Sequence, residues 1–354
     1  MTIDNQPVRV EEGSTILAAA RTLGIDIPTL CFMDGLPPGV SCMVCVVNIR
    51  GRDGLVPACS TWAEEGMVVE TGGEAVREAR RTALELLLSD HPADCVGPCQ
   101  SADPRAVNIP VMIRQVAAGD IAAAVRTLAA GEGVPAPEDV DAPRAERACR
   151  RGRHDEPVAI GLLMRYVAAH SGRFRPVGPG PRPAVGFTCR LGLPEPEEMQ
   201  AFLADASAAP RVRPAGGEAS GYTDQEARAE AARCLHCDCR KPVACKLRRY
   251  AEEYGVRPGR FRGERRAFRR ETTHPAVVYE SGKCIACGIC ARLCESRREP
   301  LGLTFVRRGF DVRVAAPFDE PLSAALTAAA EECVLACPTG ALAFRDDNRN
   351  EYGP

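Results

Sequence analysis

The chain has 354 residues, of which 45% are hydrophobic and 26% charged, so it can build ordinary globular cores over two to three domains. Its formal net charge of −2 argues against a protein whose main partner is DNA or RNA. The N-terminus has neither a basic start nor an apolar core, and no run of about 20 apolar residues occurs, so we expect neither a signal peptide nor a membrane span. Eighteen cysteines in a chain without an export signal are expected to be free or metal-bound rather than disulfide-bonded, which implies a cytoplasmic protein.

Residues 1–72 are predicted to alternate short strands with one helix. The one helix is indicated by apolar residues at helical spacing, which follow the capping hydroxyl of Ser14 and precede Gly24, where the helix should end. The expected pieces, in chain order, are a hairpin closed by Val8 and Val10, a helix capped by Ser14 and ended by Gly24, a strand over residues 42–49, a turn over 51–54 and a strand over 67–69.

Four cysteines of this segment are spaced x10, x2 and x13. Thiolate sulfur is a soft ligand that suits iron–sulfur clusters or zinc. A [2Fe–2S] site takes three cysteines from one loop and a fourth from further on, and small residues in that loop let backbone N–H groups reach sulfur. We therefore predict a [2Fe–2S] cluster, with a zinc site or free core thiols as the alternatives. The predicted ligands are Cys31, Cys42, Cys45 and Cys59.

Residues 41–45 and 57–59 resemble the ferredoxin-like domain at the N-terminus of the large iron–sulfur subunit of respiratory NADH dehydrogenase. They are also similar to the related domains of iron-only hydrogenases and NAD-linked formate dehydrogenases. The resemblance implies a β-grasp [2Fe–2S] ferredoxin-like domain over residues 1–75.

Residues 76–172 are predicted to form a helical middle domain. Helical spacing runs from Val76 to Ser89, Pro110 suits the first turn of a second helix, and Asp155 and Pro157 should open a third.

Residues 91–104 and 141–160 resemble the helical N-terminal domain of the glutamate synthase small subunit, and imply a degraded form of it, because three of its expected cysteines are missing. Cys95, Cys99 and Cys149 remain as tentative metal ligands. Either they hold one cluster with Asp103 or His91 as fourth ligand, or the helices are a scaffold that has lost its clusters, which we favour. In that family a flavin domain follows, but no Gly-x-Gly-x-x-Gly motif occurs here, so we expect no dinucleotide binding.

Residues 173–221 are rich in proline and glycine and predict a linker with one helix from Glu195 to Asp205. Residues 223–226 form a capping box and begin a helix that leads into a second cysteine group spaced x2, x1 and x5. We favour a [4Fe–4S] cluster at this group, with a zinc knot as the alternative. Its members are Cys234, Cys237, Cys239 and Cys245, and a further helix is expected over residues 246–254.

Residues 222–354 should end in a ferredoxin-like [4Fe–4S] domain. Three cysteines spaced x2 and x2, followed by Cys-Pro-x-Gly-Ala-Leu, resemble the corresponding segment of the NADH dehydrogenase subunit. That resemblance implies one [4Fe–4S] cluster held by Cys284, Cys287, Cys290 and Cys337. Cys294 and Cys333 are left over as tentative ligands, with core thiols as the safer interpretation, and Cys189 is a lone thiol.

Positive charge comes almost entirely from arginine, since lysine occurs only at positions 241, 246 and 283, which we attribute to coding bias. One basic stretch is interpreted as a solvated face or a docking surface for an acidic partner. It consists of Arg257, Arg260, Arg262, Arg265, Arg266, Arg269 and Arg270.

The sequence thus predicts an α+β multidomain protein with one [2Fe–2S] cluster, two [4Fe–4S] clusters and candidates for a third. We expect an electron-transfer subunit of a cytosolic NAD(P)H-linked multi-subunit oxidoreductase, with no catalytic residue of its own. Its partners would be a flavin- and NAD(P)-binding subunit and a hydrogenase, formate dehydrogenase, ferredoxin or glutamate-synthase-like reductase. The rival hypothesis is a zinc-stabilised interaction scaffold without redox activity.

Overall fold

A computed structural model describes residues 1–105, 107–130, 133–173, 186–345 and 349–350. The chain divides into two compact units. The first unit comprises Met1–Pro92 together with Arg240–Pro354, and the second unit comprises Ala93–Cys239. This division differs from the domain borders drawn on the sequence, which stay a prediction.

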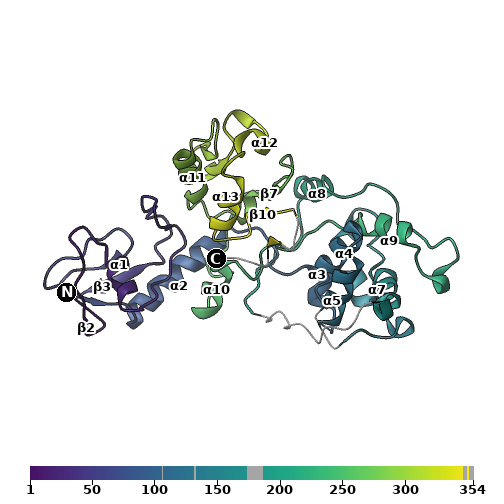
Figure 1. The fold of residues 1–354 in the computed structure, drawn as a ribbon, viewed down its shortest axis with the longest axis horizontal. Helices are drawn as coiled ribbons and strands as arrows, with labels where there is room; N and C mark the ends of the chain where they lie inside the picture. The colour runs from purple at the N-terminus through teal and green to yellow at the C-terminus, as the bar shows by residue number, and fades with distance from the viewer. Residues whose placement is uncertain (106, 131–132, 174–185, 346–348, 351–354) are drawn as a thin grey trace. The chain divides into compact units, whose positions relative to one another are not determined.

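The first unit begins with a five-stranded sheet in the order β2-β1-β5-β3-β4. Figure 1 labels strands β2 and β3 of this sheet, together with helix α1, near the N-terminus. β1 runs parallel to β5, and the other neighbouring pairs are antiparallel. An apolar core forms between the sheet and α1, and includes Ile3, Leu17 and Val47. The bounds are β1 (Thr2–Ile3), β2 (Gln6–Pro7), α1 (Ile16–Thr22), β3 (Val46–Ile49), β4 (Leu55–Pro57) and β5 (Val68–Glu70).

Two local expectations for this segment need correction. Thr15, not Ser14, caps α1, because the Thr15 side chain accepts a hydrogen bond from the backbone N–H of Ala18 at 3.2 Å. The strand expected over residues 42–49 begins only at Val46, because Met43 has a φ of +52° that turns the chain out of an extended course.

Replacing Thr15 with alanine should lower the free energy of local opening of α1 by about 1 kcal/mol, because the helix loses its capping acceptor. Hydrogen exchange of the α1 amides, followed by mass spectrometry, measures this change. Ser14→Ala is the matched control and should leave exchange nearly unchanged. Equal effects of the two substitutions would contradict the assignment of the cap.

Helix α2 (Glu74–Ser89) confirms the helical spacing read from the sequence. It packs against β3 and against α10 (Lys246–Glu253). Its buried Arg80 donates to the backbone carbonyl of Val46 at 2.9 Å and to the hydroxyl of Tyr254 at 3.0 Å. This helix therefore ties the N-terminal sheet to the later part of the first unit.

Part of the basic stretch is bound to α2 rather than solvated. Arg260 pairs with the fully buried Glu85 at 2.9 Å, and Arg266 pairs with Asp90 at 2.5 Å. These arginines hold residues 257–270 against the helix.

The C-terminal part of the first unit contains a three-stranded antiparallel sheet in the order β10-β7-β6 and a separate antiparallel pair, β8 and β9. Helix α11 packs on α13 beside them. The bounds are β6 (Arg270–Glu271), β7 (Val277–Glu280), α11 (Ile289–Arg297), β8 (Thr304–Val306), β9 (Arg313–Ala315), α12 (Leu322–Ala325), α13 (Ala330–Ala336) and β10 (Leu342–Phe344).

The second unit is helical over its described residues. One apolar core joins α4, α5, α7 and α9, and includes Ile113, Leu128, Leu163 and Ala227. The bounds are α3 (Pro98–Ala102), α4 (Ile109–Ala118), α5 (Ile121–Ala129), α6 (Pro143–Ala148), α7 (Ile160–Ala169), α8 (Pro196–Leu203) and α9 (Asp224–Ala231).

Most helix expectations for the second unit are confirmed. Pro110 lies in the first turn of α4, and Thr223 and Glu226 form the capping box of α9. The helix expected from Glu195 to Asp205 is α8, with Glu195 at its N-cap and its last residue at Leu203. The helix expected to open at Asp155 instead begins at Ile160, because Asp155 is bound to Arg151 at 2.6 Å. Residues 174–185 of the predicted linker lie outside the described residues.

No helix among the described residues is long and apolar enough to cross a membrane.

Candidate metal centres

The first predicted ligand set converges beside the N-terminal sheet. Cys31, Cys42 and Cys45 belong to the loop before β3, and Cys59 follows β4. All four are at most 4% exposed. The backbone N–H of Ala58 donates to the carbonyl of Cys45 at 3.0 Å, which fixes the two ends of the set against each other.

The thiols of this set form two hydrogen-bonded pairs, Cys31 with Cys42 and Cys45 with Cys59. A hydrogen bond from the Cys42 thiol lowers the pKa of Cys31 to about 5, with burial opposing and backbone N–H groups of Cys42 and Ser41 assisting. A hydrogen bond from Cys45 likewise lowers the pKa of Cys59, against burial and the charges of Cys31 and Cys42. In each pair the hydrogen bond therefore favours the thiolate form of one sulfur, which is the form that binds iron.

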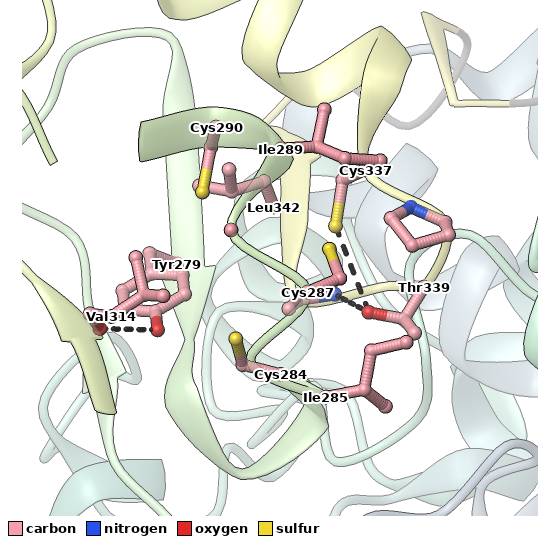
Figure 2. A pocket seen from close by; sticks show the side chains of 13 residues that line it. Tyr279, Cys284, Ile285, Cys287, Ile289, Cys290, Val314, Cys337, Thr339 and Leu342 are labelled. Carbon is pink, nitrogen blue, oxygen red and sulfur yellow. Dashed lines mark hydrogen bonds between the residues drawn. The ribbon is translucent and has the colours of Figure 1, made fainter. Parts of the chain in front are cut away.

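The third ligand set lines a hollow at the start of α11 (Figure 2). Cys284, Cys287 and Cys290 come from the segment after β7, and Cys337 comes from the C-terminal end of α13. Their sulfur atoms point toward the same hollow, whose volume of about 340 Å³ includes open solvent.

The electrostatics of this hollow suit a positively charged metal group. Burial raises the pKa of Cys284, Cys287 and Cys290, and the negative charges of the other thiolates in the set raise it further. The backbone N–H of Ala286 donates to the Cys284 sulfur at 3.3 Å, from a left-handed conformation with φ of +52°. The donors therefore fit a [4Fe–4S] cluster, whose sulfurs take hydrogen bonds from the protein backbone.

Two of the three lysines lie beside this hollow and make contacts there. We had attributed the use of lysine in this chain to coding bias alone, and these contacts give the two positions a structural reason. The ammonium group of Lys241 donates to the carbonyl oxygens of Val334 at 2.7 Å and of Cys337 at 3.3 Å. Lys283, directly before Cys284, is 2% exposed and pairs with Glu280. In the sequence, the scarcity of lysine and the position of these two lysines near cysteines could have indicated that they contact a ligand set.

Arg292 of α11 joins the first and third ligand sets. Its guanidinium donates to the carbonyl of Cys31 at 3.0 Å and to the carbonyl of Cys287 at 3.3 Å. A Cβ on Gly39 would lie 2.9 Å from the Arg292 Nη1 atom, so a side chain at this position would displace the guanidinium. The sequence analysis missed this residue, because nothing in its local spacing indicates a contact with a loop 261 residues away.

The charge of Cys31 also raises the pKa of Cys287, after burial and the charges of Cys337 and Cys284. The two ligand sets are therefore neighbours within the first unit.

The second predicted set is divided between the units. Cys234, Cys237 and Cys239 end the second unit, whereas Cys245 belongs to the first unit, where its sulfur accepts the backbone N–H of Arg248 at 3.4 Å and caps α10. Joint ligation by these four cysteines stays a prediction.

The tentative ligands have other contacts. Cys294 and Cys333 are buried and hydrogen-bonded to each other, and this bond lowers the pKa of Cys294. The Cys95 sulfur accepts the backbone N–H of Cys189 at 3.3 Å. Cys99 and Cys149 lie near Cys234 and Cys237.

The two residues proposed as replacement ligands have different neighbours. Asp103 accepts the backbone N–H of Val107 at 3.1 Å. His91 belongs to the first unit, where burial and the charge of Lys283 lower its pKa to about 4.

Among the described residues, no group of three or more His, Cys, Asp or Glu side chains converges on the position of a single metal ion. This finding concerns single ions, whereas a [4Fe–4S] cluster is a larger group with one cysteine on each of four irons.

Residues 1–74 match the family of 2Fe-2S iron-sulfur cluster binding domains. The chain is 52% identical over 95 residues to an NADH-quinone oxidoreductase subunit of Rhizobium meliloti and 52% identical over 101 residues to an NADP-reducing hydrogenase subunit of Solidesulfovibrio fructosivorans. It is 37% identical over 95 residues to the mitochondrial NADH-ubiquinone oxidoreductase 78 kDa subunit of Candida albicans. Each match covers 27% of this chain but only 11%, 17% and 13% of the respective relative.

The first 74 residues are therefore a 2Fe–2S cluster binding domain that is homologous to domains of these proteins. A chain in the crystal structure of NAD+-reducing [NiFe]-hydrogenase in the H2-reduced state superimposes on 98% of this chain and on 86% of its own length. The TM-score is 0.50 and the sequence identity 18%, so this likeness concerns the fold alone.

Proposed function

We propose that this chain is an electron-transfer subunit of a cytoplasmic NAD(P)H-linked oxidoreductase complex, with a [2Fe–2S] cluster at Cys31, Cys42, Cys45 and Cys59 and a [4Fe–4S] cluster at Cys284, Cys287, Cys290 and Cys337. The observation that carries the proposal is Arg292, whose guanidinium bonds the backbone of one ligand from each set. Adjacent ligand sets are what single-electron transfer between clusters requires, because it needs centres that lie near each other.

When bound, iron–sulfur clusters supply one-electron reduction and oxidation. The chain's own residues would tune that chemistry. Backbone N–H groups such as that of Ala286 stabilise negative charge on sulfur, and the Arg292 guanidinium adds positive charge between the two ligand sets. Burial of Cys31, Cys42, Cys45 and Cys59 keeps water away from the ligands of the [2Fe–2S] site.

The names of the relatives support the class of partner. The N-terminal domain is shared with a subunit of an NADP-reducing hydrogenase and with a subunit of an NADH-quinone oxidoreductase. We therefore infer that a flavin- and NAD(P)-binding subunit exchanges electrons with this chain. The second electron-transfer partner of this chain would be a hydrogenase, a formate dehydrogenase, a ferredoxin or a glutamate-synthase-like reductase.

Electron paramagnetic resonance of the full chain, purified anaerobically and reduced stepwise, tests this proposal. We expect a [2Fe–2S] signal, a [4Fe–4S] signal, and broadening of each signal when both centres are reduced. Sharp, independent signals would contradict adjacency of the two centres, and the lack of any signal at every potential would overturn the proposal.

Replacing Arg292 with leucine should lower the reduction potentials of both centres by on the order of 50 mV, because a positive charge that favours the reduced state is removed. Arg297→Leu is the matched control on the same helix, since Arg297 pairs with Glu332 at the surface. Potentiometric titration measures both variants. Equal potentials in Arg292→Leu and wild type would refute the assigned role.

A further inference from the structure

We propose that Thr339 is a positioning residue for the [4Fe–4S] site of the first unit, and that its hydroxyl turns its proton toward the Cys337 sulfur when this cysteine is a thiolate. Thr339 lies in the segment between α13 and β10, two residues after the fourth predicted ligand. It lines the hollow that the four sulfurs face (Figure 2). The inference rests on the proposed function, because it names a residue that sets the reduction potential of one of the two proposed clusters.

The Thr339 hydroxyl is enclosed by protein and has three polar neighbours. The residue is 1% exposed, so its hydroxyl must find its partners within the chain. The hydroxyl donates to the backbone carbonyl of Lys283 at 2.8 Å and accepts the backbone N–H of Ala341 at 3.2 Å. Its oxygen also lies 3.6 Å from the Cys337 sulfur, a contact that Figure 2 draws as a dashed line.

The hydrogen bonds of this hydroxyl are complete only while Cys337 is a thiol. A hydroxyl has one proton to donate and two lone pairs that accept. The proton of Thr339 is used by the carbonyl of Lys283, so the contact with Cys337 requires the thiol to donate. The two lone pairs then accept the N–H of Ala341 and the S–H of Cys337.

Binding of iron changes this arrangement, because cysteine binds iron as a thiolate. A thiolate only accepts hydrogen bonds, so a lone pair of Thr339 would then face a negatively charged sulfur. Rotation about the bond between Cβ and Oγ1 points the proton at the sulfur instead, and hydrogen bonds to ionised acceptors are the stronger ones. The neutral carbonyl of Lys283 loses a partner, which costs less than leaving a buried charge without one.

The donor to Cys337 thus differs from the donor to Cys284. The Cys284 sulfur accepts the backbone N–H of Ala286 at 3.3 Å, and the main chain fixes the direction of that bond. Thr339 supplies a side-chain donor that can turn. Reduction of a cluster adds negative charge to its sulfurs, so a proton that points at Cys337 stabilises the reduced state and raises the reduction potential.

The hydroxyl is not needed to hold the chain at the fourth ligand. The ammonium group of Lys241 donates to the carbonyl of Cys337 at 3.3 Å, and the backbone N–H of Leu247 donates to the carbonyl of Pro338 at 3.3 Å. These two contacts fix the main chain around Cys337. Removal of the hydroxyl should therefore leave the sulfur in place and change its hydrogen bonding.

Potentiometric titration of the anaerobically purified full chain, reduced stepwise with dithionite and followed by electron paramagnetic resonance, tests the proposal. In Thr339→Val we expect the equilibrium constant for reduction of the [4Fe–4S] cluster to fall about tenfold, which is a shift of about 59 mV for one electron. The [2Fe–2S] potential should not change, in contrast to Arg292→Leu. Thr339→Ser keeps the hydroxyl and should restore the potential. Thr327→Val is the matched control, because the Thr327 hydroxyl is exposed and bonds the carboxylate of Glu299 at 2.6 Å.

Electron–nuclear double resonance of the reduced cluster gives a readout that a merely structural role would not move. After exchange into D2O, we expect wild type and Thr339→Ser to show a deuteron coupled to the cluster that Thr339→Val lacks. Identical deuteron couplings in Thr339→Val and wild type would overturn the proposal, because the hydroxyl proton would then not point at the sulfur.

An unchanged [4Fe–4S] potential in Thr339→Val, with its signal intact, would refute the role of Thr339 and leave the proposed function standing. A shift of equal size in Thr327→Val would refute it as well. If Thr339→Val does not retain the cluster, Thr339→Ala takes its place under the same criteria. A wild-type chain without a [4Fe–4S] signal would refute the proposed function, and this proposal with it.

Discussion

Cys337→Ala should abolish the [4Fe–4S] signal of the first unit, while the [2Fe–2S] signal persists. The Cys337 sulfur faces the same hollow as those of Cys284, Cys287 and Cys290 (Figure 2). It is the only one of the four that comes from the end of α13, so its loss leaves three thiolates on one side of the hollow. A [4Fe–4S] cluster with one ligand missing is exposed to loss of iron. Electron paramagnetic resonance together with iron analysis measures this outcome.

Cys333→Ala is the matched control, because Cys333 lies in α13 itself, one turn before Cys337. Its sulfur is hydrogen-bonded to Cys294 and lies 3.7 Å from the carbonyl oxygen of Cys290, and it does not line the hollow. We expect the [4Fe–4S] signal to survive in this variant. Survival in Cys337→Ala and loss in Cys333→Ala would show that the fourth ligand has been misassigned.

The second large effect is expected at Glu280, which compensates two buried cations. Its carboxylate pairs with Arg270 at 2.9 Å and with Lys283, and all three side chains are at most 2% exposed. Glu280→Gln removes the negative charge that both cations share, which should cost roughly 3–5 kcal/mol of stability. For a unit of this size, that cost corresponds to a fall in Tm of roughly 10 °C.

Differential scanning calorimetry of the cluster-loaded chain measures the change in Tm. Glu332→Gln is the control, because Glu332 forms an exposed pair with Arg297 and should cost no more than about 1 kcal/mol. A Tm of Glu280→Gln equal to that of the control would contradict the view that Glu280 neutralises the buried cations.

The sequence predicted most of what is local. The capping box at Thr223, the helix that follows Glu195, and helix α2 depend on residues only a few positions apart, and short-range sterics and hydrogen bonds decide them. Even here, the predicted capping residue Ser14 was wrong by one position, because the backbone places Thr15 at the N-cap of α1.

Contacts between distant segments could not be predicted in the same way. Sequence spacing grouped Cys234 with Cys245, but helix packing places Cys234 in a core with Cys99. The contact of Arg292 with Cys31 depends on how α11 packs against the N-terminal loop, which no local pattern encodes. The sequence analysis attributed Lys241 and Lys283 to coding bias. Their positions near cysteines in the sequence could have indicated the buried contacts that they make beside the third ligand set.

The content of iron and acid-labile sulfide in anaerobically purified full-length chain tests the central claim most directly. Iron and sulfide in nearly equal amounts, with visible absorbance that bleaches on reduction, is the predicted result. Stoichiometric zinc with neither iron nor sulfide would contradict the claim, because the thiolates would then stabilise a fold without electron transfer.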